Sequence, residues 1–157
     1  MTQRLDYTTI APEGVKVFGD VHSYIAHSGL RYGILNLVYL RVSQINVCAY
    51  CIDLHTRDLL KSGMPQEKLT LLPVWREAAD LFSEKERAAL AWCETVTNVA
   101  QTAIPDHEYE AAKSQFSEKE LVNLTMAIGL INAYNRMAIS FRRTPDALKT
   151  KAETVGP

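Results

Sequence analysis

The sequence predicts a single all-α domain, and three observations lead to that prediction. No segment alternates apolar and polar residues with the two-residue period of a strand, and no hairpin turn separates apolar runs. Two Ser-x-x-Glu sequences, at residues 83–86 and 117–120, have the form of the capping box that begins a helix. The 157 residues are enough for one domain with a hydrophobic core of its own.

The N-terminal part of the chain predicts an arm followed by two helices. We expect residues 1–11 to form an extended arm, because Pro12 suits the first turn of a helix that should end near Gly29. The second helix, Leu30–Val42, is apolar on most of its faces and should therefore be buried nearly all round. Asn36 lies in its middle, where a buried amide needs a hydrogen-bond partner.

The next segment predicts a third helix at about Val47–Ser62. Asn46 is a favourable residue for its N-cap, and Gly63 is a favourable residue just past its end. A short helix follows at Pro65–Leu72, and Trp75 supplies an aromatic anchor for the bend after it.

The C-terminal half predicts three more helices. The first capping box precedes a helix at Ala88–Val99, Pro105 begins a helix that runs to about Gln115, and the second box precedes a long helix at Leu121–Phe141. The helical domain should thus span residues 12–143, followed by a polar tail at 144–157.

The composition excludes several function classes. A net charge of -1 and a pI near 6.4 leave no basic excess to bind nucleic acid. No stretch approaches the roughly 20 apolar residues of a membrane span, and we see no apolar signal segment. Three cysteines, an odd number, argue against a secreted disulfide framework and favour a cytoplasmic location. Two largely apolar helices are difficult to cover in a monomer, so we expect a homo-oligomer.

One Cys-x-x-Cys pair dominates the candidate chemistry. At 3.6 residues per turn, Cys48, Cys51 and His55 lie on one helix face, at positions i, i+3 and i+7. Thiols one turn apart have Cα atoms roughly 5 Å apart, which a disulfide accepts, so the pair can close and open with little backbone movement. A helix that begins at Asn46 would place Cys48 in its first turn and Cys51 in its second. Its N-terminus would favour thiolates, and His55 could accept the proton of Cys51.

Other interpretations of the pair remain open at this point. It could be half of a zinc site or two inert buried thiols, although zinc needs about four ligands. The remaining candidates do not repeat the paired spacing; they are Cys93, His22, His27 and His107. We expect Cys93 to be a core residue, and His22 and His27 to be surface or partly packed side chains unless a neighbouring subunit brings one of them to the thiols.

Two stretches of the sequence resemble a known family. Residues 37–55 carry Arg-Val-Ser-Gln-Ile-Asn ahead of Cys-x-x-Cys-x-x-x-His, which resembles the alkylhydroperoxidase AhpD core of the carboxymuconolactone decarboxylase superfamily. The segments 117–124 and 131–136 match the pattern of that family's later helices. The likeness covers roughly residues 12–143.

The resemblance implies an AhpD-like helical bundle that forms obligate homo-oligomers, often trimers or hexamers. It also implies a thiol peroxidase or disulfide reductase that needs no metal or cofactor. On this basis Cys51 attacks a hydroperoxide and becomes a sulfenic acid, Cys48 resolves it to a disulfide, and His55 belongs to the proton relay. A thiol protein or small thiol would then regenerate the enzyme.

The sequence departs from the family at one position. Asn36 stands where the family often has a glutamate that begins the proton relay, and an amide cannot gain or lose a proton near neutral pH. Peroxidase turnover could then be slow, and Asn36→Glu should raise it if the relay runs through this position. Asp53 should point away from the thiols. The alternatives are a redox-sensing or assembly protein and, less favoured, a lactone-acid decarboxylase.

Overall fold

A computed structural model describes residues 2–148, and within that range the secondary structure is helical. None of the helices in this part of the chain is both long enough and apolar enough to cross a membrane. The α-helices are α1 (Tyr7–Ile10), α2 (Pro12–Ala26), α3 (Tyr32–Ile45), α4 (Ala49–Lys61), α5 (Gln66–Leu71), α6 (Glu84–Thr97), α7 (Val99–Thr102), α8 (Asp106–Lys113) and α9 (Glu118–Ser140), and two short 3₁₀ helices are η1 (Leu72–Val74) and η2 (Ala79–Leu81).

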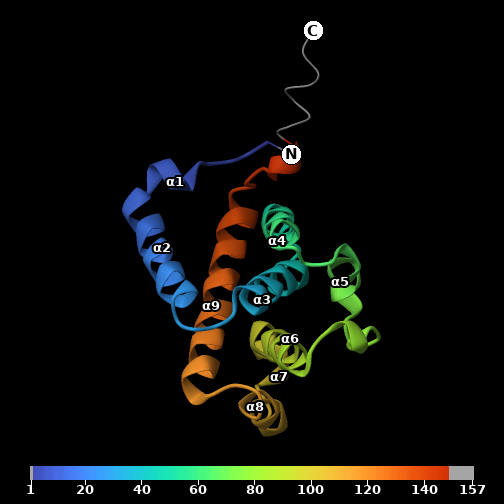
Figure 1. The fold of residues 1–157 in the computed structure, drawn as a ribbon. Helices are drawn as coiled ribbons and strands as arrows, with labels where there is room; N and C mark the ends of the chain where they lie inside the picture. The colour runs from blue at the N-terminus through green and yellow to red at the C-terminus, as the bar shows by residue number, and fades with distance from the viewer. Residues whose placement is uncertain (1, 149–157) are drawn as a thin grey trace.

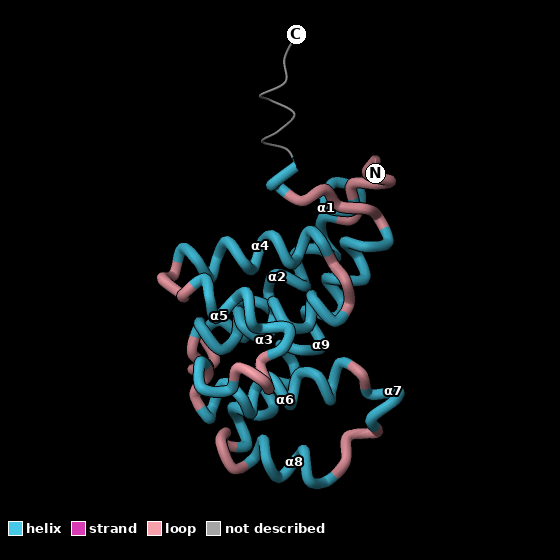
Figure 2. The backbone as a smooth tube through the Cα atoms, turned by 90° about the vertical axis from the view of Figure 1, so that its right-hand side faces the viewer, coloured by secondary structure: helices cyan, strands magenta, loops and turns pink. Residues whose placement is uncertain are grey.

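Four helices are stacked one above the other, and the longest helix runs across them. In Figure 2, α4, α3, α6 and α8 succeed one another from top to bottom, and each contacts the next. Helix α9 touches all four of them, and α2 packs along its other side, as Figure 1 shows. The all-α prediction is confirmed, and α3 occupies the centre of the bundle.

The central helix is buried on opposite faces, as its apolar sequence predicted. Leu37 and Leu40 belong to one core cluster, which they share with α4, the η1 segment and α6. Val38 and Val42 belong to a second cluster, which includes residues of α2, α6, α8 and α9. Cys93 lies in that second cluster with no exposed surface, so its prediction as a core residue is confirmed.

Both capping boxes form as the sequence predicted. The Ser83 and Ser117 hydroxyls accept the backbone N–H groups of Glu86 and Glu120 at 3.3 Å. The two glutamates in turn accept the backbone N–H groups of the serines at 2.8 and 2.9 Å. These reciprocal bonds satisfy donors that would otherwise lack partners, so they fix where α6 and α9 begin.

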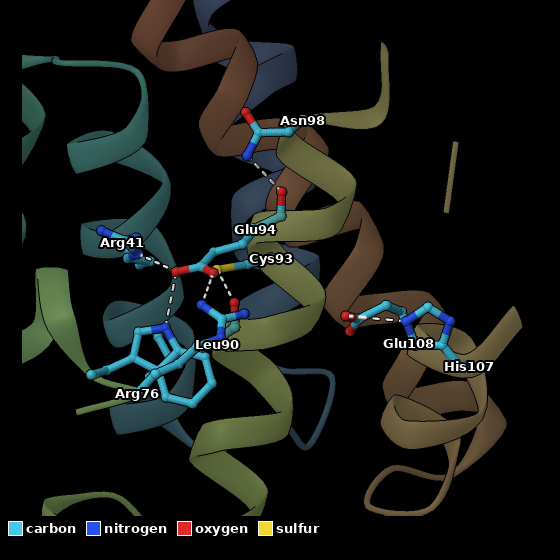
Figure 3. A network of polar contacts seen from close by, with 9 residues as sticks. Arg41, Arg76, Leu90, Cys93, Glu94, Asn98, His107 and Glu108 are labelled. Carbon is cyan, nitrogen blue, oxygen red and sulfur yellow. Dashed lines mark hydrogen bonds and ion pairs between the residues drawn. The ribbon is translucent and has the colours of Figure 1, made fainter. Parts of the chain in front are cut away.

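A partly buried ion pair joins α3 to α6 (Figure 3). The Arg41 Nε donates to Glu94 Oε1 at 2.7 Å, the Trp75 Nε1 donates to the same oxygen at 2.9 Å, and Arg76 pairs with the other oxygen. Burial opposes ionisation of this carboxyl, but the three donors outweigh it and hold the pKa of Glu94 below its usual range. The predicted aromatic anchor at Trp75 is thus tied to the bundle by its ring nitrogen as well as by its buried ring.

The prediction of an extended arm over residues 1–11 is wrong for residues 7–10. Residues 7–10 form helix α1, because the Asp6 side chain accepts the backbone N–H of Thr8 at 3.0 Å and caps it. The backbone N–H of Arg4 donates to the carbonyl of Phe141 at 3.0 Å, so the segment before α1 is fixed to the end of α9 (Figure 1).

The first residues of the expected tail are also part of the folded domain. Arg57 binds both Asp53 and Asp146 at 2.9 Å, and the backbone N–H of Ala147 donates to Asp53 at 3.1 Å. These contacts hold residues 146–148 as a helical turn against α4. The rest of the predicted tail, residues 149–157, lies outside the described residues.

Candidate functional site

The thiols follow a reversal of the backbone between α3 and α4. Asn46 is the C-cap of α3, Val47 has a left-handed conformation with φ +56°, and Cys48 is the N-cap of α4. The predicted N-cap at Asn46 is therefore wrong, because the chain turns back after Asn46. Cys48 donates its backbone N–H to the Ser43 carbonyl at 2.9 Å, which closes the turn.

The Asn46 side chain binds α9 instead of capping α4. Its Nδ2 donates to Asn132 Oδ1 at 2.8 Å and to Asn135 Oδ1 at 2.9 Å, both on α9. Asn135 is fully buried, and its own Nδ2 donates to the Ser43 hydroxyl at 3.1 Å. These bonds clamp the thiol-bearing turn to α9. They also explain structurally why serine and asparagines stand at these positions, since each buried amide group needs a partner.

The reversal at Val47 gives a stability prediction. A β-branched residue with positive φ is strained by roughly 1–3 kcal/mol, and the Val47 side chain is 79% exposed, so its removal loses little packing. Val47→Gly should therefore raise the free energy of unfolding by about 1 kcal/mol, measured by urea denaturation.

The matched control is Val122→Gly, an exposed valine within the regular α9 helix. There the same exchange should lower the free energy of unfolding by about 0.5 kcal/mol, because glycine is a poorer helix former than valine. A loss of stability in both variants would contradict the assignment of strain to Val47.

The two thiols are paired as a disulfide at the N-terminus of α4. The Cα atoms of Cys48 and Cys51 are 5.4 Å apart, close to the distance that the sequence predicted. Cys48 is the N-cap and Cys51 lies in the first turn, so both sulfurs are near the end of a helix that favours negative charge. The third cysteine, Cys93, is different, because burial raises the pKa of its thiol far above the usual range.

A cavity of about 220 Å³ gives the two sulfurs different surroundings. Cys51 and His55 line this cavity, whereas Cys48 lines a second hollow of about 430 Å³. The two spaces share Tyr50, Ala138 and Arg143 in their walls. The polar groups that surround Cys51 and His55 in the first cavity are Tyr7, His22, Tyr39, Tyr50, Tyr134 and Arg143.

His55 stands one helical turn after Cys51 and is neutral near pH 7. Burial, together with the nearby His22, lowers the pKa of His55 from its ordinary value of 6.5 to about 4. Its buried Nδ1 has no hydrogen-bond partner in the described part of the chain. A neutral imidazole with a free ring nitrogen is able to accept a proton.

The structure adds two side chains to the site that the sequence had not assigned to it. Tyr39 of α3 is 4% exposed, and its ring centroid is 5.2 Å from that of His55. His22 of α2 also lies beside Tyr39, with ring centroids 6.0 Å apart. Ile25 is the buried residue of α2, and its spacing of three from His22 is the sequence signal that could have placed His22 near the packed side of that helix.

Asn36, a predicted site residue, lines neither of the hollows at the two cysteines. It is 7% exposed, and its Nδ2 donates to the carbonyl of Tyr32 at 3.1 Å, which gives it the partner that its burial required. It is not among the residues that line the cavity with Cys51 and His55. Its role in a relay stays a prediction. Asp53 accepts bonds from Arg57 and the backbone of Ala147, so its carboxylate is engaged away from the cavity.

The site offers no evident cluster of metal ligands. Across residues 2–148, no three histidine, cysteine, aspartate or glutamate side chains come together in an arrangement that could hold a metal ion.

Comparisons with known proteins identify the family of the chain and its fold. The sequence model of the carboxymuconolactone decarboxylase family matches residues 12–95. The uncharacterized protein YdfG of Bacillus subtilis is 37% identical over 140 residues, which cover 89% of this chain and 95% of YdfG.

Two solved structures have the same fold. One is ATU0492 from Agrobacterium tumefaciens, a protein of unknown function that has been suggested to be the antioxidant defence protein AhpD. It superposes with a TM-score of 0.88 at 38% identity, and the match covers 92% of this chain and 98% of ATU0492. An uncharacterized peroxidase-related protein from Ralstonia eutropha JMP134, with an alkylhydroperoxidase AhpD core, superposes with a TM-score of 0.77 at 20% identity, over 88% of this chain and 73% of its own. The latter likeness concerns the fold alone.

Proposed function

The chain belongs to the carboxymuconolactone decarboxylase family, and from that premise we propose that it is a thiol-dependent hydroperoxide reductase with an AhpD-like fold. The observation that carries the proposal is the asymmetry of the disulfide. Cys51 shares a cavity with an imidazole and several hydroxyl groups, whereas Cys48 lines a different hollow. A histidine thus lines the cavity of Cys51, whereas the described residues that line the hollow of Cys48 include none.

The proposed reaction proceeds in three steps. The Cys51 thiolate attacks one oxygen of the peroxide, the O–O bond breaks, and the sulfur becomes a sulfenic acid while an alcohol leaves. The Cys48 thiol then attacks this sulfur, which forms the disulfide and releases water. A thiol reductant supplies two electrons that restore both thiols. His55 accepts the proton that the Cys51 thiol gives up.

The cavity and the helix terminus support the assignment of Cys51 as the attacking sulfur. The N-terminus of α4 lowers the cost of forming a thiolate at either cysteine. Only for Cys51 is a histidine placed at i+4 on the same helix, and residues four apart on a helix are neighbours. Cys48 is left as the resolving thiol, one turn away and already within disulfide distance.

A single-turnover oxidation tests this function directly. The reduced protein is mixed with one equivalent of an organic hydroperoxide, and the products are analysed by intact mass and differential alkylation. We expect rapid loss of two hydrogens, mapped to Cys48 and Cys51, while Cys93 stays alkylatable after denaturation. Both thiols of the pair remaining alkylatable over minutes would contradict a peroxidase function.

We also infer that the protein is a cytoplasmic homo-oligomer built through α2 and α9. Val17, Phe18 and Val21 of α2 and Met126 of α9 are exposed and line one largely apolar hollow. Apolar surface of this kind is usually covered in an assembly. Sedimentation of the oxidised and the reduced protein measures the assembly and also tests the redox-sensor alternative, which requires the two states to differ in size.

A further inference from the structure

We propose that the Tyr39 hydroxyl is the acid that protonates the leaving alkoxide, in place of a carboxylate at position 36. The inference rests on the proposed function and assigns one further catalytic residue to it. It follows from where the ring lies, from the lack of a partner for its hydroxyl, and from the proton balance of the reaction.

The Tyr39 hydroxyl is a buried donor that no described residue uses. The residue is 4% exposed and lines the cavity that contains Cys51, and its hydroxyl has no hydrogen-bond partner among residues 2–148. A buried hydroxyl without a partner costs free energy, so a purely structural tyrosine would be expected to bond a neighbouring group. The hydroxyl instead keeps an unused proton in a residue of the cavity wall, which is what donation to a bound peroxide requires.

Tyr39 and Asn36 stand one turn apart on the same side of α3. Residues at i and i+3 are neighbours on a helix, so both positions face in similar directions. The amide of Asn36 is occupied by the Tyr32 carbonyl, whereas Tyr39 reaches the cavity. The resemblance places the start of the relay at position 36. This chain thus carries a proton donor one helical turn after that position.

A proton donor is needed at this point of the reaction. Attack by Cys51 breaks the O–O bond and leaves an alkoxide, which is about as basic as hydroxide, whose conjugate acid has a pKa of about 15.7 in bulk water. The alkoxide takes the Tyr39 proton, and the resulting phenolate takes the proton that His55 received from the Cys51 thiol. The sum is a thiol and a hydroperoxide converted into a sulfenic acid and an alcohol, with Tyr39 and His55 restored.

The surroundings set the starting protonation states of both groups, and the same pKa shifts make Tyr39 a weaker acid and His55 a weaker base than the free side chains. Burial, and secondarily Tyr134, raise the pKa of the Tyr39 hydroxyl far above its usual range, so it is protonated before the reaction. His55 is neutral because burial and His22 lower its pKa to about 4. The other titratable groups in the cavity wall are Tyr7 from α1, Tyr50 from α4, and Arg143 after α9.

The test compares two kinds of peroxide in single-turnover reactions of Tyr39→Phe. With an alkyl hydroperoxide, we expect the rate of Cys51 oxidation to fall by about 10²-fold, the lower end of the effect of general acid catalysis. With a peroxycarboxylic acid the leaving group is a carboxylate, which has a conjugate acid with a pKa of only about 4 and needs no acid. That rate should stay within about twofold of the unsubstituted protein.

The control Tyr109→Phe removes the hydroxyl of a tyrosine outside the cavity, beside Trp92, and should change neither rate.

The outcomes separate this inference from the function on which it rests. If the unsubstituted protein does not oxidise Cys51 with either peroxide, the proposed function is wrong. If it does, and Tyr39→Phe reacts at the same rate with the alkyl hydroperoxide, Tyr39 is not the acid. Equal losses with both peroxides would also overturn the inference, because they would show that the phenol positions Cys51 or the substrate rather than donating a proton.

Discussion

Replacing Cys51 with serine should lower the rate of hydroperoxide consumption by about 10³-fold or more. A serine hydroxyl is not ionised near neutral pH, so it cannot replace a thiolate as the nucleophile, and removal of a nucleophile is among the largest single-residue effects in enzymes. The substitution is nearly isosteric at a buried position, so the fold should be retained. The measurement is peroxide consumption at steady state in the presence of excess dithiol.

The matched control for this prediction is Cys48→Ser. It removes the resolving thiol but leaves Cys51 with the same cavity and the same histidine. The first oxidation should then proceed at nearly the unsubstituted rate and stop at a sulfenic acid, which a carbon nucleophile specific for sulfenic acids traps on Cys51. A sulfenic acid trapped on Cys48 in the Cys51→Ser variant, with undiminished peroxide loss, would reverse the assigned roles.

The second large effect is a loss of stability in mild acid that depends on His55. The folded protein holds the pKa of His55 near 4, mainly by burial, whereas the unfolded chain has the ordinary value of 6.5. Between these values the unfolded state binds the proton and the folded state does not, so stability falls as the pH drops from 6.5 to 4. This difference in pKa contributes about 3 kcal/mol to the free energy of unfolding above pH 6.5, and the contribution is lost as the pH falls to 4.

The measurement is urea denaturation of the oxidised protein at several pH values, at one protein concentration, compared with that of His55→Asn. Protonation of carboxylates such as Glu94 also destabilises the protein in acid, but this effect is the same in both proteins and cancels in the comparison. His107→Asn is the control, since that histidine has an exposed side chain and should leave the pH dependence unchanged. Parallel curves for the unsubstituted protein and His55→Asn would show that His55 is not held neutral by burial.

The sequence by itself determined the helical class, most helix positions and the thiol pair. These features rest on local chemistry. Capping boxes at Ser83 and Ser117 and the apolar surface of α3 act between residues a few positions apart, so they are visible in the sequence. The same holds for the separation of Cys48 and Cys51, because a single helical turn sets it.

The errors in the prediction come mainly from interactions between distant segments. Asn46 has the side chain of a good N-cap, but it caps no helix N-terminus because Asn132 and Asn135 of α9 bind its amide. The backbone of Arg4 is held by Phe141 at the end of α9, whereas helix α1 begins at a local cap, Asp6, which the prediction missed. No local pattern around Asn46 or Arg4 contains its distant partner.

Only the tertiary structure decided which side chains meet in the cavity beside Cys51. Cys51 and His55 come from one helix, so their spacing predicted their proximity. Tyr39 comes from α3 and His22 from α2, and their rings gather near His55 because α9 packs against α2, α3 and α4 together. The physical reason is that helix formation depends on neighbours in the sequence, whereas a cavity depends on how the faces of several helices are packed against one another.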